Sequence, residues 1–217
     1  MRTFGFPEFL FILEAAKWTL ALSAIAFVGG AILGLIVALM RTSQSTWARG
    51  VSTTFIQVFQ GTPLLLQLFL VFFGAPVLGL DINPWVAAGV ALILNSAAFL
   101  GEIWRGCIEA IPRGQWEAAE ALSLRYTSRM RDVVLPQALK IALAPTVGYV
   151  VQIIKGTSLA AIIGFVEVTR AGQIVNNATF QPLIVFSVVA AIYFAICWPL
   201  SLLAARMERR RARALAR

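Results

Sequence analysis

The chain has 217 residues, of which 59% are hydrophobic and 13% charged, whereas soluble domains average about 45–50% apolar and about 25% charged residues. Together with a mean hydropathy of +0.83, this composition excludes a water-soluble monomer and predicts an all-α integral membrane protein. The sequence has no histidine, so it lacks the commonest general base and metal ligand. The net charge of +8 could suggest nucleic-acid binding, but on so apolar a chain it more often reflects orientation in the membrane.

The long intervals between charged residues predict five membrane spans, because the hydrocarbon core requires about 20 apolar residues in a helix. The predicted spans are residues 18–40, 55–74, 84–104, 137–157 and 183–205. The fourth is the least regular, and we expect irregular or re-entrant structure after it. No cleavable signal peptide is expected, and residues 1–217 are predicted to form a single transmembrane domain.

Basic residues are distributed unevenly between the two sides of these spans. With the N-terminus outside, the inner segments 41–54, 105–136 and the tail after residue 205 hold 13 Lys and Arg, and the outer segments hold 3. Because basic residues favour the cytoplasmic side, the prediction is N-out and C-in. Orientation and contact with anionic membrane lipid explain the arginine-rich tail, and no nucleic-acid partner is expected.

Several small and polar residues inside the spans are candidate functional positions. A stripe of Ala26, Gly30 and Gly34 is interpreted as helix packing. The sequence Gly-Thr-Pro at 61–63 would break the second span and free backbone carbonyls inside the bilayer. The residues that we single out as a candidate substrate path or gate are Gly61, Thr62, Pro63, Asn95, Glu102, Lys155, Thr157 and Ser158.

Each of these candidates has a structural alternative that the sequence leaves open. The 61–63 break is as compatible with a packing kink as with a gate, and Asn95 can bond across helices instead of touching solute. Lys155 could pair with an acid to hold a dimer, although an intramembrane charge is a functional hypothesis by default. For Glu102, an ion pair with Arg105 three residues later is the favoured interpretation.

The inner segment 105–136 is the largest soluble part and contains a predicted short helix. Pro112 and Gly114 precede a run of strong helix formers, which predicts a helix over about 115–124. Alanines within this run would let a partner approach closely. Pro136 is expected to open the fourth span, since proline is well tolerated in a first helical turn.

The same segment resembles the EAA loop of ABC importer permeases. Glu117-Ala118-Ala119 is followed by Ser123 where glycine is usual, and then by Leu135-Pro136 at the family spacing. Four more segments resemble the polar amino-acid (histidine, glutamine or arginine type) branch, in order along the chain: Phe59–Leu65, Ala98–Gly106, Ile111–Gln115 and Lys155–Leu159. Ser123 and Gln60, where arginine is frequent, depart from the pattern.

The resemblance implies a type I ABC importer permease fold, a location in the bacterial inner membrane, and a coupling helix that sits in a groove of a cytoplasmic ATPase. The residues implied in ATPase coupling are Gly114, Glu117, Ala118, Ala119, Leu122, Ser123, Leu135 and Pro136. No Gly-x-x-x-x-Gly-Lys-Ser/Thr loop occurs in the chain. We therefore expect ATP and Mg²⁺ on a partner ATPase and no cofactor or catalysis here.

By the same resemblance, the expected assembly has two ABC ATPase subunits, a second permease chain (identical or related) and an external solute-binding protein, and it imports a polar amino acid. The alternative is a stand-alone channel or ion-coupled transporter, which would need neither nucleotide nor the 115–124 helix. A membrane hydrolase is disfavoured, because histidine and nucleophile motifs are missing.

Overall fold

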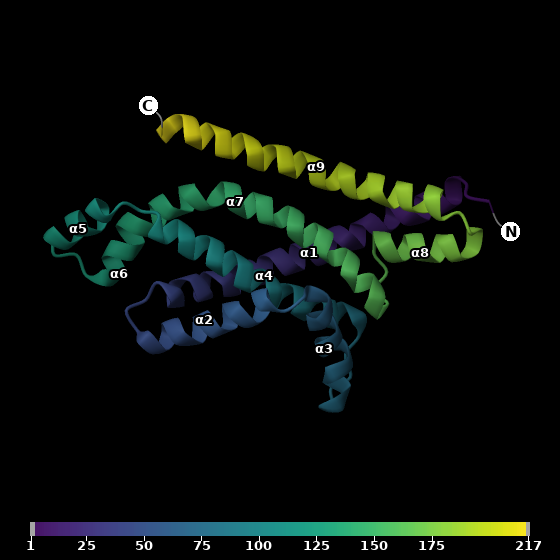
Figure 1. The fold of residues 1–217 in the computed structure, drawn as a ribbon, viewed down its shortest axis with the longest axis horizontal. Helices are drawn as coiled ribbons and strands as arrows, with labels where there is room; N and C mark the ends of the chain where they lie inside the picture. The colour runs from purple at the N-terminus through teal and green to yellow at the C-terminus, as the bar shows by residue number, and fades with distance from the viewer. Residues whose placement is uncertain (1–2, 216–217) are drawn as a thin grey trace.

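The computed structural model describes residues 3–215, and side chains up to residue 210, so that the arginines of the tail beyond Arg210 lie outside the described side chains. The described part consists of helices without a strand (Figure 1). Its elements are α1 (Phe6–Arg41), α2 (Thr46–Gly61), α3 (Leu64–Val77), α4 (Pro84–Glu109), α5 (Arg113–Ala121), α6 (Tyr126–Ser128), the π-helical turn η1 (Arg129–Val134), α7 (Leu135–Gly156), the 3-10 turn η2 (Thr157–Ile163), α8 (Val168–Thr179) and α9 (Pro182–Leu215).

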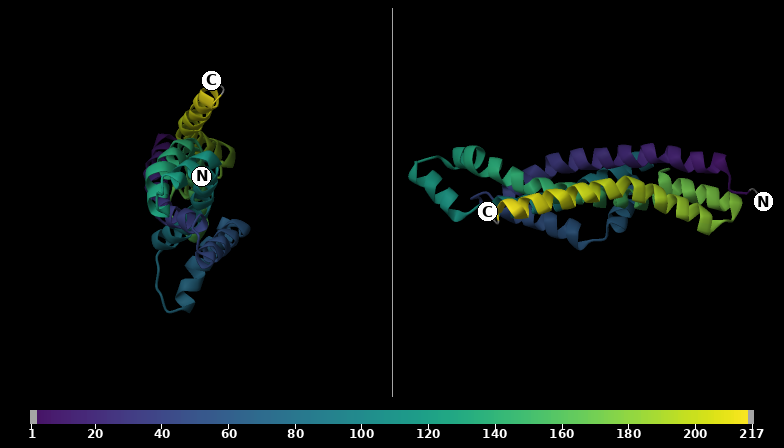
Figure 2. Two further views of the ribbon diagram at one scale, coloured as in Figure 1. Left: turned by 90° about the vertical axis from the view of Figure 1, so that its left-hand side faces the viewer. Right: turned by 90° about the horizontal axis from the view of Figure 1, so that it is seen from above.

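The long helices run along one axis of an elongated molecule (Figures 1 and 2). At one end lie α5, α6 and the end of α9, and at the other end lie α8 and the start of α1. The helix α3 leans away from this bundle (Figure 1). The predicted inner loop and the C-terminal helix end therefore share one end of the molecule, opposite the N-terminus.

The membrane-spanning helices confirm the all-α membrane fold. Among the described residues, four continuous helical stretches are long and apolar enough to cross a bilayer, and the pair α2–α3, bent by 101°, makes a fifth if it counts as one span. The predicted break at 61–63 is therefore confirmed. Several helices outrun the predicted spans: α1 begins at Phe6, where Glu8 accepts a hydrogen bond from the Gly5 amide at 3.0 Å. Charge-free intervals locate apolar surface, not helix ends.

The helices α1 and α4 pack closely through small residues. A Cβ atom added to Gly30 would lie 2.5 Å from Cβ of Ser96, and one added to Gly101 would lie 2.8 Å from a methyl group of Val37. Without a hydrophobic driving force inside lipid, such close backbone approach is how membrane helices gain dispersion energy. The predicted packing role of the Gly30 stripe is confirmed.

The segment after α7 contains a helix that the sequence did not predict. The turn η2 ends at Gly164 in the left-handed region (φ +87°), and α8 follows. The carboxylate of Glu167, which is fully buried, caps α8 by accepting bonds from the amides of Thr169 (2.9 Å) and Arg170 (2.8 Å), and Tyr193 donates to it at 2.5 Å. Burial raises the pKa of Glu167. This network attaches α8 to α9.

Candidate coupling and pathway sites

The helix α5 ends in a turn that explains why related permeases usually have glycine at position 123. The Leu124 amide donates to the Ala119 carbonyl at 3.2 Å and the Ser123 amide to the Glu120 carbonyl at 2.8 Å, which is a Schellman motif. Ser123 takes the left-handed conformation (φ +54°) that this motif requires and that glycine adopts without cost. The helix covers Arg113–Ala121, so the predicted 115–124 helix was placed too late at both ends, because Leu122–Leu124 form the turn.

A hydrophobic cluster anchors α5 to the membrane domain. Ile108 and Ile111 at the end of α4 pack with Met130, Val134 and Ala138 from η1 and α7, and the side chain of Trp116 packs on this cluster from α5. The Tyr126 hydroxyl donates to the Thr42 carbonyl at 2.8 Å, which links the loop to the end of α1. The loop that carries α5 is therefore in contact with the ends of α1, α4 and α7.

The implied coupling residues divide into an anchored set and an exposed set. Ala119 is 3% exposed and Leu135 is half-buried in the anchoring cluster. Gly114, Glu117, Ala118 and Pro136 are exposed, as is Leu122, with 75% of its surface free. One side of α5 is thus held by the permease fold while the other is free.

The break between α2 and α3 is held by two amide side chains. The Gln67 amide group donates to the carbonyls of Phe59 (2.9 Å) and Thr62 (3.0 Å), which the break at Pro63 removes from helical bonding. The side-chain amide of Asn95 on α4 donates to the side-chain oxygen of Gln67 (Oε1) at 3.1 Å and to the backbone carbonyl of Phe59 at 3.4 Å. Carbonyls left unpaired at membrane depth would cost several kcal/mol each. The structure therefore brings Gly61–Pro63 and Asn95 together, through Gln67.

The end of α7 lies beside this break. Gly156 is in contact range of side chains of Leu64 and Leu92, since a Cβ added there would lie 3.2 and 3.5 Å from them. Lys155 is exposed in the described chain. Thr157 is fully buried and donates to the Ile154 carbonyl at 2.7 Å, which satisfies its hydroxyl within the backbone. Ser158 is half-exposed and donates to the Lys155 carbonyl.

Glu102 lies apart from the break and forms the predicted ion pair. It accepts two bonds from the Arg105 guanidinium, at 2.6 and 2.9 Å, and Arg105 also contacts Glu109 one turn further on. This triad lies at the α5 end of α4, two turns from Asn95. The structural interpretation of Glu102 as half of an i,i+3 pair is confirmed.

A comparison with protein families identifies the family to which the chain belongs. Residues 30–213 match the family described as the inner membrane component of binding-protein-dependent transport systems. The chain belongs to this family. The permease is therefore a multi-pass inner-membrane protein and a non-catalytic subunit, since the ATPase of these transporters is a separate subunit.

Named relatives and solved structures are similar over nearly the full length of the permease. It is 37% identical to the glutamine transport system permease protein GlnP of Escherichia coli K12, over 94% of each chain. It is 35% identical to the probable amino-acid ABC transporter permease protein YckA of Bacillus subtilis, over 88% of this chain and 84% of that one. A solved amino acid ABC transporter with histidines is 33% identical, with a TM-score of 0.88 over 96% of this chain and 100% of that one.

A more distant structure supports the fold alone. The MetNI methionine ABC transporter in an inward-facing conformation matches with a TM-score of 0.79 over 95% of this chain and 99% of that one, at 18% identity. The described residues of the permease contain no group of three or more Cys, Asp or Glu that could hold a metal ion.

Sequence reasoning missed two residues that organise the permease near the break. Gln67 was passed over although it is the single polar residue within the run from Leu64 to Val71, and a lone amide in such a run has to find a partner. The hydroxyl of Tyr149 on α7 lies 3.5 Å from the side-chain oxygen of Asn95 (Oδ1), and the Tyr149 ring stacks on Phe99 with the ring centroids 5.4 Å apart. Nothing in its spacing distinguishes it from an ordinary packing aromatic.

Proposed function

We propose that this permease imports polar amino acids and couples their movement to a separate ATPase through α5. The observation that carries the proposal is the pairing of an exposed docking side on α5 with a firmly packed anchor on the opposite side. The names of the relatives, which include glutamine and amino-acid permeases, support the substrate class.

In the proposed mechanism, ATP and Mg²⁺ bind between two ATPase subunits, whose closure moves the docked helices. Gly114, Glu117, Ala118 and Leu122 contact the ATPase, while Ala119 and Leu135 lie on the packed side. Ser123 shapes the turn that ends α5, and Pro136 lies in the first turn of α7. Small residues on the docking side allow a groove to close tightly around the helix, and Glu117 provides a charged contact. Because α5 is packed against α4 and η1–α7, its displacement is a rigid-body motion of the spans.

The proposed assembly contains a second permease, identical or related, and an external solute-binding protein. Large apolar side chains on α3 are exposed in the single chain, including Leu70 (72%), Phe73 (60%) and Val77 (85%). This area suits either lipid or a second permease. The orientation N-out and C-in puts α5 on the ATPase side, in agreement with the 13-to-3 distribution of basic residues.

The proposed substrate path passes the α2–α3 break. Gly61, Thr62 and Pro63 are exposed there, Asn95 lies behind them, and Lys155 and Ser158 flank the neighbouring end of α7. In this arrangement Thr157 has a packing role, because its hydroxyl is already bonded, and Glu102 has a structural role with Arg105.

The test is uptake into proteoliposomes that contain the permease with its cognate ATPase and binding protein. Radiolabelled polar amino acids should accumulate only when ATP and the binding protein are both supplied. Uptake that continues without ATP would contradict the proposal and favour a stand-alone channel or an ion-coupled transporter. A reaction that lacks only the binding protein shows whether uptake requires delivery of the amino acid by that protein in addition to ATP.

A further inference from the structure

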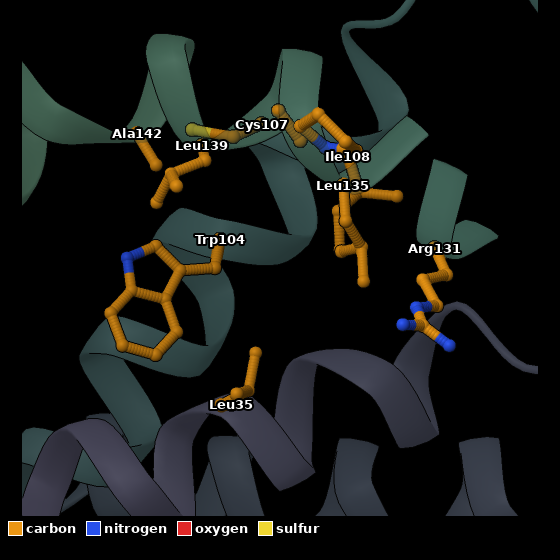
Figure 3. Close-up of a pocket in the computed structure, with 10 residues that line it drawn as sticks. Leu35, Trp104, Cys107, Ile108, Arg131, Leu135, Leu139 and Ala142 are labelled. Atoms are coloured by element: carbon orange, nitrogen blue, oxygen red, sulfur yellow. The ribbon is translucent and has the colours of Figure 1, made fainter. Parts of the chain in front are cut away.

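A cavity of about 470 Å³ lies between α1, α4 and α7 at the end of the molecule that carries α5. Its volume is within the range of small-molecule sites, about 300–1,000 Å³. Figure 3 shows Trp104 at one side and Arg131 at the other, with Leu35 of α1 below them. The lining residues are Leu35, Trp104, Cys107, Ile108, Arg131, Leu135, Pro136, Ala138, Leu139 and Ala142.

The lining is apolar along the helices and cationic at one end. Arg131, on η1, is the single charged residue of the lining, and its side chain is 88% exposed; the carboxylate of the neighbouring Asp132 lies 3.9 Å away, also exposed. An exposed pair at that distance contributes little. The guanidinium therefore remains available to an anion that approaches the cavity.

Exposed apolar side chains of membrane-spanning helices form part of the cavity's edge. Leu139 (63% exposed) and Leu35 (45% exposed) stand at its edge, on helices that span the bilayer. The Trp104 indole nitrogen donates to the Thr146 hydroxyl at 2.9 Å, so the polar atom of this ring is satisfied away from the lining. The cavity therefore offers an apolar surface along the helices and one guanidinium group at its end.

We propose that this cavity binds one anionic phospholipid, with an acyl chain between α4 and α7 and the phosphate on Arg131. Basic pockets between membrane helices on the cytoplasmic side are suited to anionic headgroups, and guanidinium groups bind phosphate in two-point geometry. The assignment to the cytoplasmic leaflet rests on the orientation given under Proposed function. The lipid-binding measurement below uses bilayers with the same lipid in both leaflets, so its outcome is independent of that orientation.

The experiment measures quenching of Trp104 by lipids with brominated acyl chains. The permease, assembled with its ATPase, is placed in bilayers that contain brominated phosphatidylglycerol or brominated phosphatidylcholine at equal mole fraction. The quenching of Trp104 alone is obtained as the difference in fluorescence quenching between the wild type and Trp104→Phe. We expect phosphatidylglycerol to occupy the cavity about fivefold more tightly, which is the preference that one arginine near a membrane surface provides.

Substitutions at Arg131 test the role of the guanidinium. Arg131→Gln should reduce the fivefold preference to none, and Arg131→Lys should retain part of it. Since the side chain is exposed, neither change threatens folding. Arg125→Gln is the matched control, because it removes the same charge from an exposed position of the same loop outside the cavity.

Three outcomes would overturn the proposal. Equal quenching by the two lipids would show only general exposure to the bilayer, and an equal effect of Arg125→Gln would show only surface electrostatics. If neither lipid quenched Trp104 in the assembled transporter, a protein partner would cover the cavity instead.

Discussion

Gln67 shows how one side chain can make a broken span tolerable. Its amide donates to two carbonyls that Pro63 leaves free, and its own oxygen is held by Asn95. Buried groups without partners cost about 1–3 kcal/mol each. The geometry of the break and the stability of the fold therefore depend on the same side chain.

Gln67→Leu should destabilise the permease by about 1–3 kcal/mol, because the Thr62 carbonyl loses its amide donor while the volume stays similar. Thermal unfolding in detergent measures the effect as a lower melting temperature. Gln57→Leu, at an exposed position of α2, is the matched control and should have no comparable effect. Equal melting temperatures for both variants would show that Gln67 does not hold the break.

Ser123→Gly should strengthen the end of α5. The left-handed conformation costs a non-glycine residue about 1–2 kcal/mol, and glycine loses about 0.5–1 kcal/mol through its greater freedom when unfolded, so a gain of about 0.5–1 kcal/mol is expected. Amide hydrogen exchange in α5 should slow by about two- to fivefold. Ser128→Gly, at negative φ (−67°), should not slow exchange; if it did so equally, conformational strain at Ser123 would not be the cause.

At the scale of elements, α5 matters because its two sides face different environments. Ala118 is exposed, whereas Ala119, the next residue, is buried inside the permease. A bulky residue at Ala118 therefore meets nothing inside the permease and obstructs only a partner. The same change at Ala119 would damage the fold, so a loss of stability could not be separated from a loss of partner binding.

Ala118→Trp and Glu117→Lys should abolish ATPase binding or uncouple ATP hydrolysis from uptake, without lowering the melting temperature of the permease. Co-purification of the ATPase and uptake in proteoliposomes measure the two effects. Ala110→Trp, an exposed alanine just before α5, is the control and should transport normally. Normal transport by both α5 variants would exclude α5 as the coupling helix.

For the whole molecule, the elongated bundle separates the two membrane faces clearly. The α5 end carries the inner loop and the end of α9, and the opposite end carries α8 and the N-terminus (Figure 1). Both native cysteines are nearly buried, at 6% and 7% exposure. Introduced cysteines can thus report which end faces outward.

Leu80→Cys, in the exposed turn before α4, should react with an impermeant maleimide in intact spheroplasts, because N-out orientation puts this turn outside. Gln44→Cys, between α1 and α2, should react only after permeabilisation. Replacement of Cys107 and Cys197 by alanine provides the background. The reverse pattern would show that the N-terminus is inside, contrary to the basic-residue distribution.

The membrane class, the number of apolar spans and the 61–63 break followed from sequence, because hydropathy, helix length and proline act locally. The family motif located the candidate coupling loop, although α5 begins and ends earlier than predicted, since the position of its end depends on the turn at Ser123. The helix α8 was missed because Glu167 caps it from a buried position that only α9 completes.

Sequence by itself therefore determined that this chain is a multi-pass permease and which loop carries the coupling motif. Only the tertiary structure decided that Gln67 and Asn95 hold the break together. It also decided that an apolar cavity with one arginine lies between α1, α4 and α7. Gln67 and Asn95 lie 28 positions apart in the sequence, and the cavity joins residues of three long helices, so no local pattern contains either feature.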